Sequence, residues 1–378
     1  MELIAFSEIF EFQKKSKIKA GDGLSINEGE YPFYTSSNIL SKSINEFQFE
    51  GDSLIFGTGG QASIHFCDNR FSVSTDCFVT KPKNIDLVYT KFVYYYLAGN
   101  IHILEKGFKG AGLKHISKDY LQKIQIPLPS LEVQKAIVAR LDKADEVRQL
   151  NQQIINHYEE LIQALFIDMF GDPVKNEKGW EKNNFGNYIK ILTDYHANGS
   201  YESLKEVVTL KDEIDFALMV RTTDLENNNF TDDVKYISEV AYNFLSKSKV
   251  FGNEIIMNKI GSAGNIYLMP ELDRPVSLGM NAFLIRIDES KVNNIYIFNL
   301  LKTDFGMNEI KKRVKGAVTK TIKKEAVREI PIVIPPIELQ NQFAERVQKI
   351  EAQKELAEQA LQQSENLFNS LLQQAFKK

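Results

Sequence analysis

Apolar residues recur three or four positions apart in two long stretches of the chain. The first begins after Pro127-Leu128-Pro129 and stops at Gly171-Asp172-Pro173, and the second begins after Pro335-Pro336. This spacing is helical, so each stretch predicts a helix of roughly 40 residues, about 60 Å long at about 1.5 Å per residue. The predicted apolar faces are Ile137, Leu141, Ala144, Val147, Leu150, Ile154, Tyr158, Leu161, Leu165 and Met169 in the first helix, and Phe343, Val347, Ile350, Ala357, Leu361, Leu367 and Leu371 in the second.

A helix of this length cannot bury one apolar stripe by itself, so the two are each other's natural partners. Because each follows its own globular segment, we predict that they pair as an antiparallel coiled coil. The globular segments hold short β-forming runs separated by glycine clusters, and residues 88–105 and 293–312 favour short helices. We therefore predict an α+β fold with mainly antiparallel sheets. The expected strands are 31–34, 52–56, 64–66, 76–79, 254–257, 265–268 and 282–285.

The chain also contains an internal two-fold sequence repeat. Residues 109–171 and 315–377 align without a gap, with identities such as Lys114/Lys320 and Gln134/Gln340. A weaker match precedes them, including Phe6/Phe185 and 34–39 against 220–225. Two copies are too few for a solenoid, so the repeat indicates a pseudo-dimer with two similar surfaces, which suits duplex DNA. We predict domains at 1–129 and 172–335, and long helices at 130–171 and 336–378.

Composition is that of a globular protein, with 43% hydrophobic and 25% charged residues and no apolar run long enough to span a membrane. The first residues lack the pattern of a secretory signal, so we expect a cytoplasmic protein without a membrane partner. Cys67 and Cys77 are expected to be small buried side chains. The net charge of −4 argues against a stand-alone DNA binder but not against a subunit whose partners supply phosphate contacts.

Positive charge is concentrated in two clusters. Lys14, Lys15, Lys17 and Lys19 lie near the start, and Lys311, Lys312, Arg313, Lys315, Lys320, Lys323 and Lys324 precede the second long helix. Each cluster is compatible with a DNA-facing surface or with an ordinary solvated face.

The arrangement resembles the specificity subunit of type I restriction-modification systems over essentially the whole chain. The resemblance rests on the two helix starts, Ile126-Pro127-Leu128-Pro129-Ser130-Leu131-Glu132-Val133-Gln134 and Ile334-Pro335-Pro336-Ile337-Glu338-Leu339-Gln340. It also rests on Met169-Phe170-Gly171-Asp172-Pro173, Val220-Arg221-Thr222-Thr223-Asp224-Leu225 and Tyr31-Pro32-Phe33-Tyr34-Thr35-Ser36.

The resemblance implies two target-recognition domains, each reading half of a split sequence in double-stranded DNA. The paired helices would fix the unread gap and dock two modification subunits. Those partners would carry the S-adenosylmethionine site and methylate adenine at N6, and motor-nuclease restriction subunits would add cleavage. No cofactor is expected in this chain itself.

Two sets of residues are candidates for DNA contact. The first comprises polar residues after a strand, which suit groove edges or are ordinary turn residues: Thr35, Ser36, Ser37, Asn38, Arg221, Thr222, Thr223 and Asp224. The second comprises residues in or beside glycine turns that suit approach to the DNA backbone: Thr58, Gln61, Lys114, Lys259, Ser262, Asn265 and Lys320.

Catalytic motifs do not emerge from the sequence. Gly57-Thr58-Gly59-Gly60 opens no predicted helix, 107–114 departs from the phosphate-binding loop pattern, and the five histidines lack metal-ligand spacing. We therefore expect a non-catalytic DNA specificity subunit. The alternative is a coiled-coil assembly protein whose globular domains bind protein rather than DNA.

Overall fold

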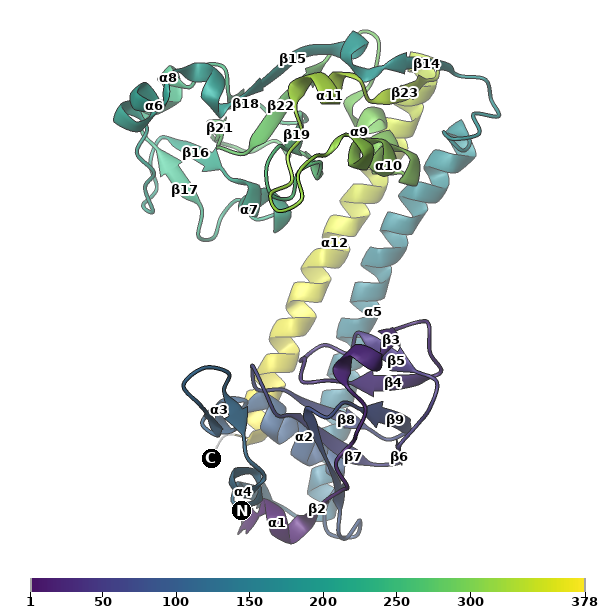
Figure 1. Cartoon of the computed structure of the whole chain (residues 1–378), viewed down its shortest axis with the longest axis vertical. Coiled ribbons are helices and arrows are strands. Elements are labelled where there is room, and N and C mark those ends of the chain that lie inside the picture. The colour runs from purple at the N-terminus through teal and green to yellow at the C-terminus, as the bar shows by residue number, and fades with distance from the viewer. Residues whose placement is uncertain (1, 377–378) are drawn as a thin grey trace. The chain divides into compact units, whose positions relative to one another are not determined.

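The computed structural model describes residues 2–376, which form two compact units (Figure 1). Unit 1 comprises Met1–Gln153 and Ala357–Lys378, and unit 2 comprises Ile154–Leu356. The two long helices are α5 (Leu131–Phe170) and α12 (Ile337–Phe376), as predicted. Each long helix contributes one part to unit 1 and another to unit 2, a division that the four predicted segments did not foresee.

Unit 1 is built from small, mainly antiparallel sheets. Its four-stranded sheet has the order β2 (Phe10–Phe12), β10 (Cys77–Pro82), β7 (Ser53–Gly57), β8 (Ile64–Cys67). Its five-stranded sheet has the order β3 (Leu24–Ser25), β5 (Lys42–Ile44), β4 (Tyr31–Tyr34), β9 (Arg70–Val73), β6 (Phe49–Glu50). Two pairs complete it: β1 (Glu2–Ala5) with β13 (Gln125–Leu128), and β11 (Phe108–Lys109) with β12 (His115–Ile116). Its shorter helices are α1 (Phe6–Ile9), η1 (Ala20–Asp22), α2 (Thr90–Gly99), α3 (His102–Glu105) and α4 (Lys118–Gln122).

Unit 2 repeats this plan. Its first four-stranded sheet has the order β15 (Ile189–Asp194), β22 (Ala282–Ile287), β19 (Ile255–Asn258), β20 (Ile266–Leu268). The second has the order β17 (Lys235–Ile237), β16 (Ala217–Val220), β21 (Val276–Leu278), β18 (Lys249–Val250), and β14 (Glu181–Asn184) pairs with β23 (Pro331–Ile334). The shorter helices are η2 (Phe185–Tyr188), η3 (Tyr195–Asn198), α6 (Tyr201–Val207), α7 (Thr222–Glu226), α8 (Glu239–Phe244), α9 (Asn294–Lys302), α10 (Asp304–Arg313) and α11 (Lys324–Arg328).

Matched positions confirm the predicted duplication. The sheet orders β2-β10-β7-β8 and β15-β22-β19-β20 are the same, and all of their neighbouring strands are antiparallel. The other large sheet of each unit contains one parallel pair of strands. The pair is β4 with β9 in unit 1 and β16 with β21 in unit 2. Phe6 and Phe185 are both fully buried at the same place in the two units. The α+β fold and every predicted strand are present, and both cysteines are buried.

The two long helices run antiparallel against each other within each unit. In unit 2, Phe166 and Phe170 pack against Phe343, with ring centroids 5.6 and 5.2 Å apart. In unit 1, the side-chain Nδ2 of Asn151 donates to the Ala360 carbonyl at 3.2 Å and to Ser364 Oγ at 3.3 Å. The predicted pairing of the helices is therefore confirmed.

The predicted apolar face of α5 was wrong in the middle of the helix. Val147, Leu150, Ile154 and Leu161 are between 43% and 50% exposed, whereas Ile155 and Ile162 are buried. The contacting positions follow a spacing of about 3.5 residues, which is that of a helix pair. Polar residues such as Asn151 occupy some of the positions of α5 that contact α12. A prediction from apolar residues alone therefore placed the contact face on the wrong side in this part of the helix. Leu367 of α12 is likewise 54% exposed.

A buried glutamine ties the start of each long helix to its own unit. Gln134 Nε2 donates to the Leu87 and Pro129 carbonyls at 3.0 and 2.9 Å, and its Oε1 accepts from the Tyr89 amide at 2.8 Å. Gln340 Nε2 donates to the Pro335 carbonyl at 2.7 Å, and its Oε1 accepts from the Asn293 amide at 2.9 Å. Both side chains are fully buried. We call these equivalent residues the glutamine clamps.

Replacing Gln340 by Leu should destabilise unit 2 by roughly 1–3 kcal/mol, because the Asn293 amide and the Pro335 carbonyl lose their buried partner. Chemical denaturation followed by circular dichroism measures the change. Gln348→Leu, at an exposed position of the same helix, is the matched control. Equal unfolding midpoints for the two variants would contradict the structural role of this clamp.

Candidate nucleic-acid interface

Three segments far apart in the sequence meet at one surface of unit 2. They are Arg221 with α7, the glycine turn 258–265, and the hairpin 315–321 that precedes the second long helix. Glu226 Oε1 accepts from Ser262 Oγ at 2.5 Å, which joins the first two segments. The Gly261 amide donates to the Lys320 carbonyl at 3.0 Å, and the Ile322 amide donates to the Lys259 carbonyl at 3.0 Å. The hairpin is thereby fixed to the glycine turn.

Glycine is required in this turn for conformational reasons. Gly261 and Gly264 have φ angles of +80° and +93°, in the left-handed region. In the turn, Ser262 Oγ accepts from the side-chain Nδ2 of Asn258 at 2.8 Å, and Asn258 is fully buried. The predicted turn is therefore present, and it holds Ser262 and Asn265 at the surface beside α7.

Unit 1 assembles the equivalent three segments. Ser63 Oγ donates to the Ser36 carbonyl at 3.1 Å, and His65 Nε2 lies 2.8 Å from the Ser37 carbonyl oxygen. Burial lowers the pKa of His65, so the neutral ring donates its Nε2 proton to this carbonyl. These contacts join the loop 35–38 to the turn that begins at Gly57.

The hairpin before α5 closes the same arrangement in unit 1. The Gly60 amide donates to the Lys114 carbonyl at 3.2 Å, and the Ile116 amide donates to the Thr58 carbonyl at 3.1 Å. A side chain at Gly57 would place its Cβ 2.9 Å from Ser36 Cα, so this close approach also requires glycine. Each unit therefore brings the sequence-predicted residues together at one surface, which we call the loop surface of that unit.

The predicted residues differ in how accessible they are on these loop surfaces. The exposed ones are Ser37, Asn38, Gln61, Lys114, Thr223, Asn265 and Lys320, and the partly exposed ones are Thr35, Ser36, Arg221, Thr222 and Ser262. Thr58, Asp224 and Lys259 are buried. The structure therefore gives twelve of the fifteen predicted residues an accessible position on the loop surfaces.

Arg221 and Asp224 form one structural unit. The guanidinium Nη2 lies 2.7 Å from Asp224 Oδ1 and 2.5 Å from the Asp233 carbonyl oxygen, and the Arg221 amide donates to Asp224 Oδ2 at 2.7 Å. The hydrogen bond that the guanidinium donates to Asp224 raises the pKa of Arg221, so the guanidinium stays charged. Asp224, the third residue of α7, is therefore the buried anchor that orients Arg221 and accepts from its backbone amide at the start of the helix.

Lys259 is held in a buried ion pair. Its Nζ lies 2.8 Å from Asp194 Oδ2, and both side chains are about nine-tenths buried. Lys324 Nζ lies 3.5 Å from the other oxygen of Asp194. Burial alone would raise the pKa of Asp194, but the hydrogen bond from Lys259 and the charges of Lys259 and Lys324 hold it below its ordinary value. This ammonium is therefore directed into unit 2, and its geometry does not present it to a phosphate.

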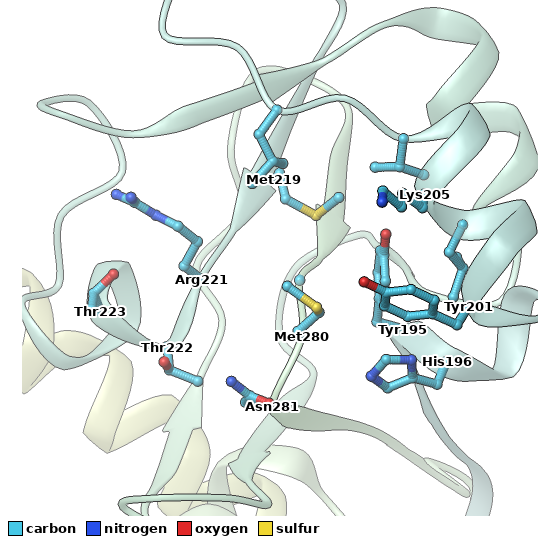
Figure 2. A pocket seen from close by; sticks show the side chains of 14 residues that line it. Tyr195, His196, Tyr201, Lys205, Met219, Arg221, Thr222, Thr223, Met280 and Asn281 are labelled. Atoms are coloured by element: carbon cyan, nitrogen blue, oxygen red, sulfur yellow. The ribbon is translucent and has the colours of Figure 1, made fainter.

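A hollow of about 530 Å³ lies next to Arg221, Thr222 and Thr223 in unit 2. In Figure 2, Arg221 and Thr223 lie on one side, Tyr201 and His196 on the other, and Met219 and Met280 between them. Tyr201 and Met280 are 70% and 52% exposed. Methionine and aromatic side chains give this wall an apolar, polarisable surface beside the polar loop.

Sequence reasoning missed several residues at these surfaces. Glu226 lies two positions beyond the predicted 221–224 segment, and its hydrogen bonds from Ser262 and Asn258 show that it joins the site. Tyr201 belongs to α6 and His196 to η3, elements for which the repeat offers no unit 1 counterpart, so the duplication could not point to them. Asn281, with φ of +72°, follows Met280 at the edge of the hollow.

Residues 2–376 contain no cluster of three or more His, Cys, Asp or Glu side chains that could hold a metal ion. Across the same range, no helix is long and apolar enough to cross a bilayer.

Comparison with known proteins identifies the family. Residues 1–160 and 180–366 match the type I restriction modification DNA specificity domain. The chain belongs to the type I restriction-modification specificity (S) subunit family. Such a subunit determines DNA target recognition and is a non-catalytic part of its complex.

Relatives match this S subunit over nearly its full length. It is 23% identical to the EcoDI specificity subunit of Escherichia coli, over 98% of this chain and 87% of that one. It is 24% identical to the MjaVIII specificity subunit of Methanocaldococcus jannaschii, over 91% and 86% of the two chains. The fold is similar to the crystal structure of an S subunit from M. genitalium, with a TM-score of 0.62, 16% identity, and 100% and 96% coverage.

Replacing Lys259 by Met should destabilise this S subunit by about 3 kcal/mol, because Asp194 then loses its closest buried partner. The pKa of Asp194 is lowered, so the pair stabilises the fold above pH about 4 and the stabilisation is lost as pH falls through the lowered value. Denaturation at pH 7 measures the loss of stability, and denaturation at pH 3 measures how much of it depends on the charge of Asp194. Lys323→Met, at an exposed position, is the control. A variant as stable as this control, with a weaker salt dependence of DNA binding, would instead restore the phosphate role predicted for Lys259.

Proposed function

We propose that this S subunit reads a split target in double-stranded DNA, one half with each loop surface, and docks two modification subunits that methylate adenine at N6. The observation that carries the proposal is the repeated assembly of three segments. In both units the segment after a strand, a glycine turn and the hairpin before a long helix are joined through hydrogen bonds. The segment after the strand is the loop 35–38 in unit 1 and Arg221 with α7 in unit 2.

The accessible groups of the loop surfaces suit DNA. Asn38 and Asn265 carry amides that can pair with adenine, Arg221 carries a guanidinium that can pair with guanine, and hydroxyls can serve either. Lys114 and Lys320 are exposed at equivalent positions of the two hairpins and suit phosphates. Lys259, Asp224 and Thr58 are left out of the proposed contact set, because they are buried. Base contacts of this kind give each unit its own sequence preference.

Docking of the modification subunits is supported by α5. Val147 and Leu150 in unit 1, and Ile154 and Leu161 in unit 2, are exposed apolar side chains of this helix. Exposed apolar side chains gathered on one element are typical of protein interfaces. The modification subunits would supply S-adenosylmethionine, and restriction subunits would add DNA cleavage.

Expression of the modification subunits with and without this chain tests the proposed function. We expect adenine methylation at a motif of two short blocks separated by unread positions, and loss of that motif without the chain. Sequencing that detects methylated adenines gives the result directly. Methylation that is unaffected by removal of the chain, or purified complex that binds protein but no DNA, would support the alternative of an assembly protein.

Substitutions in the loop 35–38 of unit 1 and in α7 of unit 2 should act on different halves of the motif. Asn38→Ala should relax one base position in one block, and Thr223→Ala should relax one position in the other, with losses of about 1–3 kcal/mol against the original target. Competition binding with single-base variants of the target measures each effect. Relaxation of the same block by both variants would contradict one half-site for each unit.

A further inference from the structure

We propose that residues 14–19 of unit 1 form a phosphate-binding strap that unit 2 lacks, an inference that rests on the proposed reading of DNA. The segment connects β2 to η1 and contains Lys14, Lys15, Lys17 and Lys19. We call it the lysine strap. Its ligand is the phosphodiester backbone of the duplex next to the half-site that unit 1 reads.

Burial along the lysine strap alternates. Ser16 is 7% exposed and Ile18 is half-buried, whereas Lys15, Lys17 and Lys19 are exposed. In an extended chain, alternate residues lie about 6.6 Å apart and point to the same side. Three ammonium groups in such a row match the regular succession of phosphates along one DNA strand.

The lysine strap is attached to the loop surface through the backbone. The Thr75 amide donates to the Ile18 carbonyl at 2.7 Å, and the Thr58 amide donates to the Asp76 carbonyl at 2.8 Å. The Ile116 amide in turn donates to the Thr58 carbonyl. The row of lysines is thus fixed beside the turn and the hairpin that carry Gln61 and Lys114.

The charges of the lysine strap are not neutralised within the described residues. None of its four ammonium groups makes an ion pair there, and Lys15 Nζ lies 5.9 Å from the centre of the Phe78 ring. By contrast, Lys312 and Arg313 of α10 both pair with Glu309. In a chain of net charge −4, four unpaired lysines beside a loop surface form a local site for an anion.

Unit 2 uses the equivalent stretch differently. β15 corresponds to β2 in sheet order, but it leads into η3 and α6 instead of an extended segment. Those helices provide Tyr195, His196 and Tyr201 to the hollow. Lys190, within β15, is paired with Asp288 at 3.0 Å. The two units therefore differ at the segment that flanks otherwise equivalent loop surfaces.

The test compares Lys15→Gln/Lys17→Gln/Lys19→Gln with Lys15→Arg/Lys17→Arg/Lys19→Arg in the assembled complex with modification subunits. Fluorescence anisotropy measures binding to a duplex with the motif that the complex methylates and to a scrambled duplex, across a range of salt concentrations. Loss of three phosphate contacts should lower the slope of log affinity against log salt by about 2.7 and weaken binding on the order of 100-fold near 0.1 M salt. The arginine variant should keep the original slope, because it keeps the charges.

Both duplexes should lose affinity equally, and the methylated motif should stay the same, because phosphate contacts carry no base information. An unchanged slope in the glutamine variant, or an equal loss in the arginine variant, would overturn the lysine strap. A changed motif would show base contact and would overturn it as well. If the unaltered complex showed no sequence-dependent binding, the proposed function would fail first, and this inference with it.

Discussion

The antiparallel contact between α5 and α12 is the constraint on which the other features depend. Neither helix can bury its apolar positions alone, and each unit completes its core with helical residues from distant parts of the chain. In unit 1 these include Phe368 and Phe376 near the end of α12, whose rings lie 6.1 and 5.4 Å from Tyr95 and Phe92. The glutamine clamps then fix the start of each helix to its own sheets. The core of each unit therefore contains residues from both copies of the repeat.

This constraint also positions the loop surfaces. A short helix and a strand connect each hairpin to its long helix, α4 and β13 in unit 1 and α11 and β23 in unit 2. The hairpin is bonded to a glycine turn, and the turn is bonded to the loop 35–38 in unit 1 and to α7 in unit 2. A shift of the helix start that passes through these elements would displace the polar groups of the loop surface. The two units share this frame but differ beside it, with a lysine strap in one and an apolar hollow in the other. The shared frame supports the proposal of one common function, and the differences would give each proposed half-site its own chemistry.

Much of the fold could be predicted, because helical spacing, proline boundaries and the internal repeat are local properties of the sequence. The helix bounds and the strands followed from them. The contact face of α5 could not, since Asn151 is polar yet lies at the helix pair, and the exposed Leu150 is apolar. The loop segments at the site were predictable from the repeat. The orientation of Lys259 was not, because its partner Asp194 lies 65 residues away and only the fold brings them together.

The proposal that the paired helices fix the unread gap is tested most directly by changing the length of both helices. Four residues inserted after Gln153 of α5, with four after Leu356 of α12, lengthen both helices by about 6 Å and keep them paired. One base pair adds about 3.4 Å along the duplex. We expect methylated adenines in cells expressing this variant to lie in a motif with both blocks unchanged and one or two more unread base pairs between them. An active complex that methylates the original motif with its original gap would contradict the account.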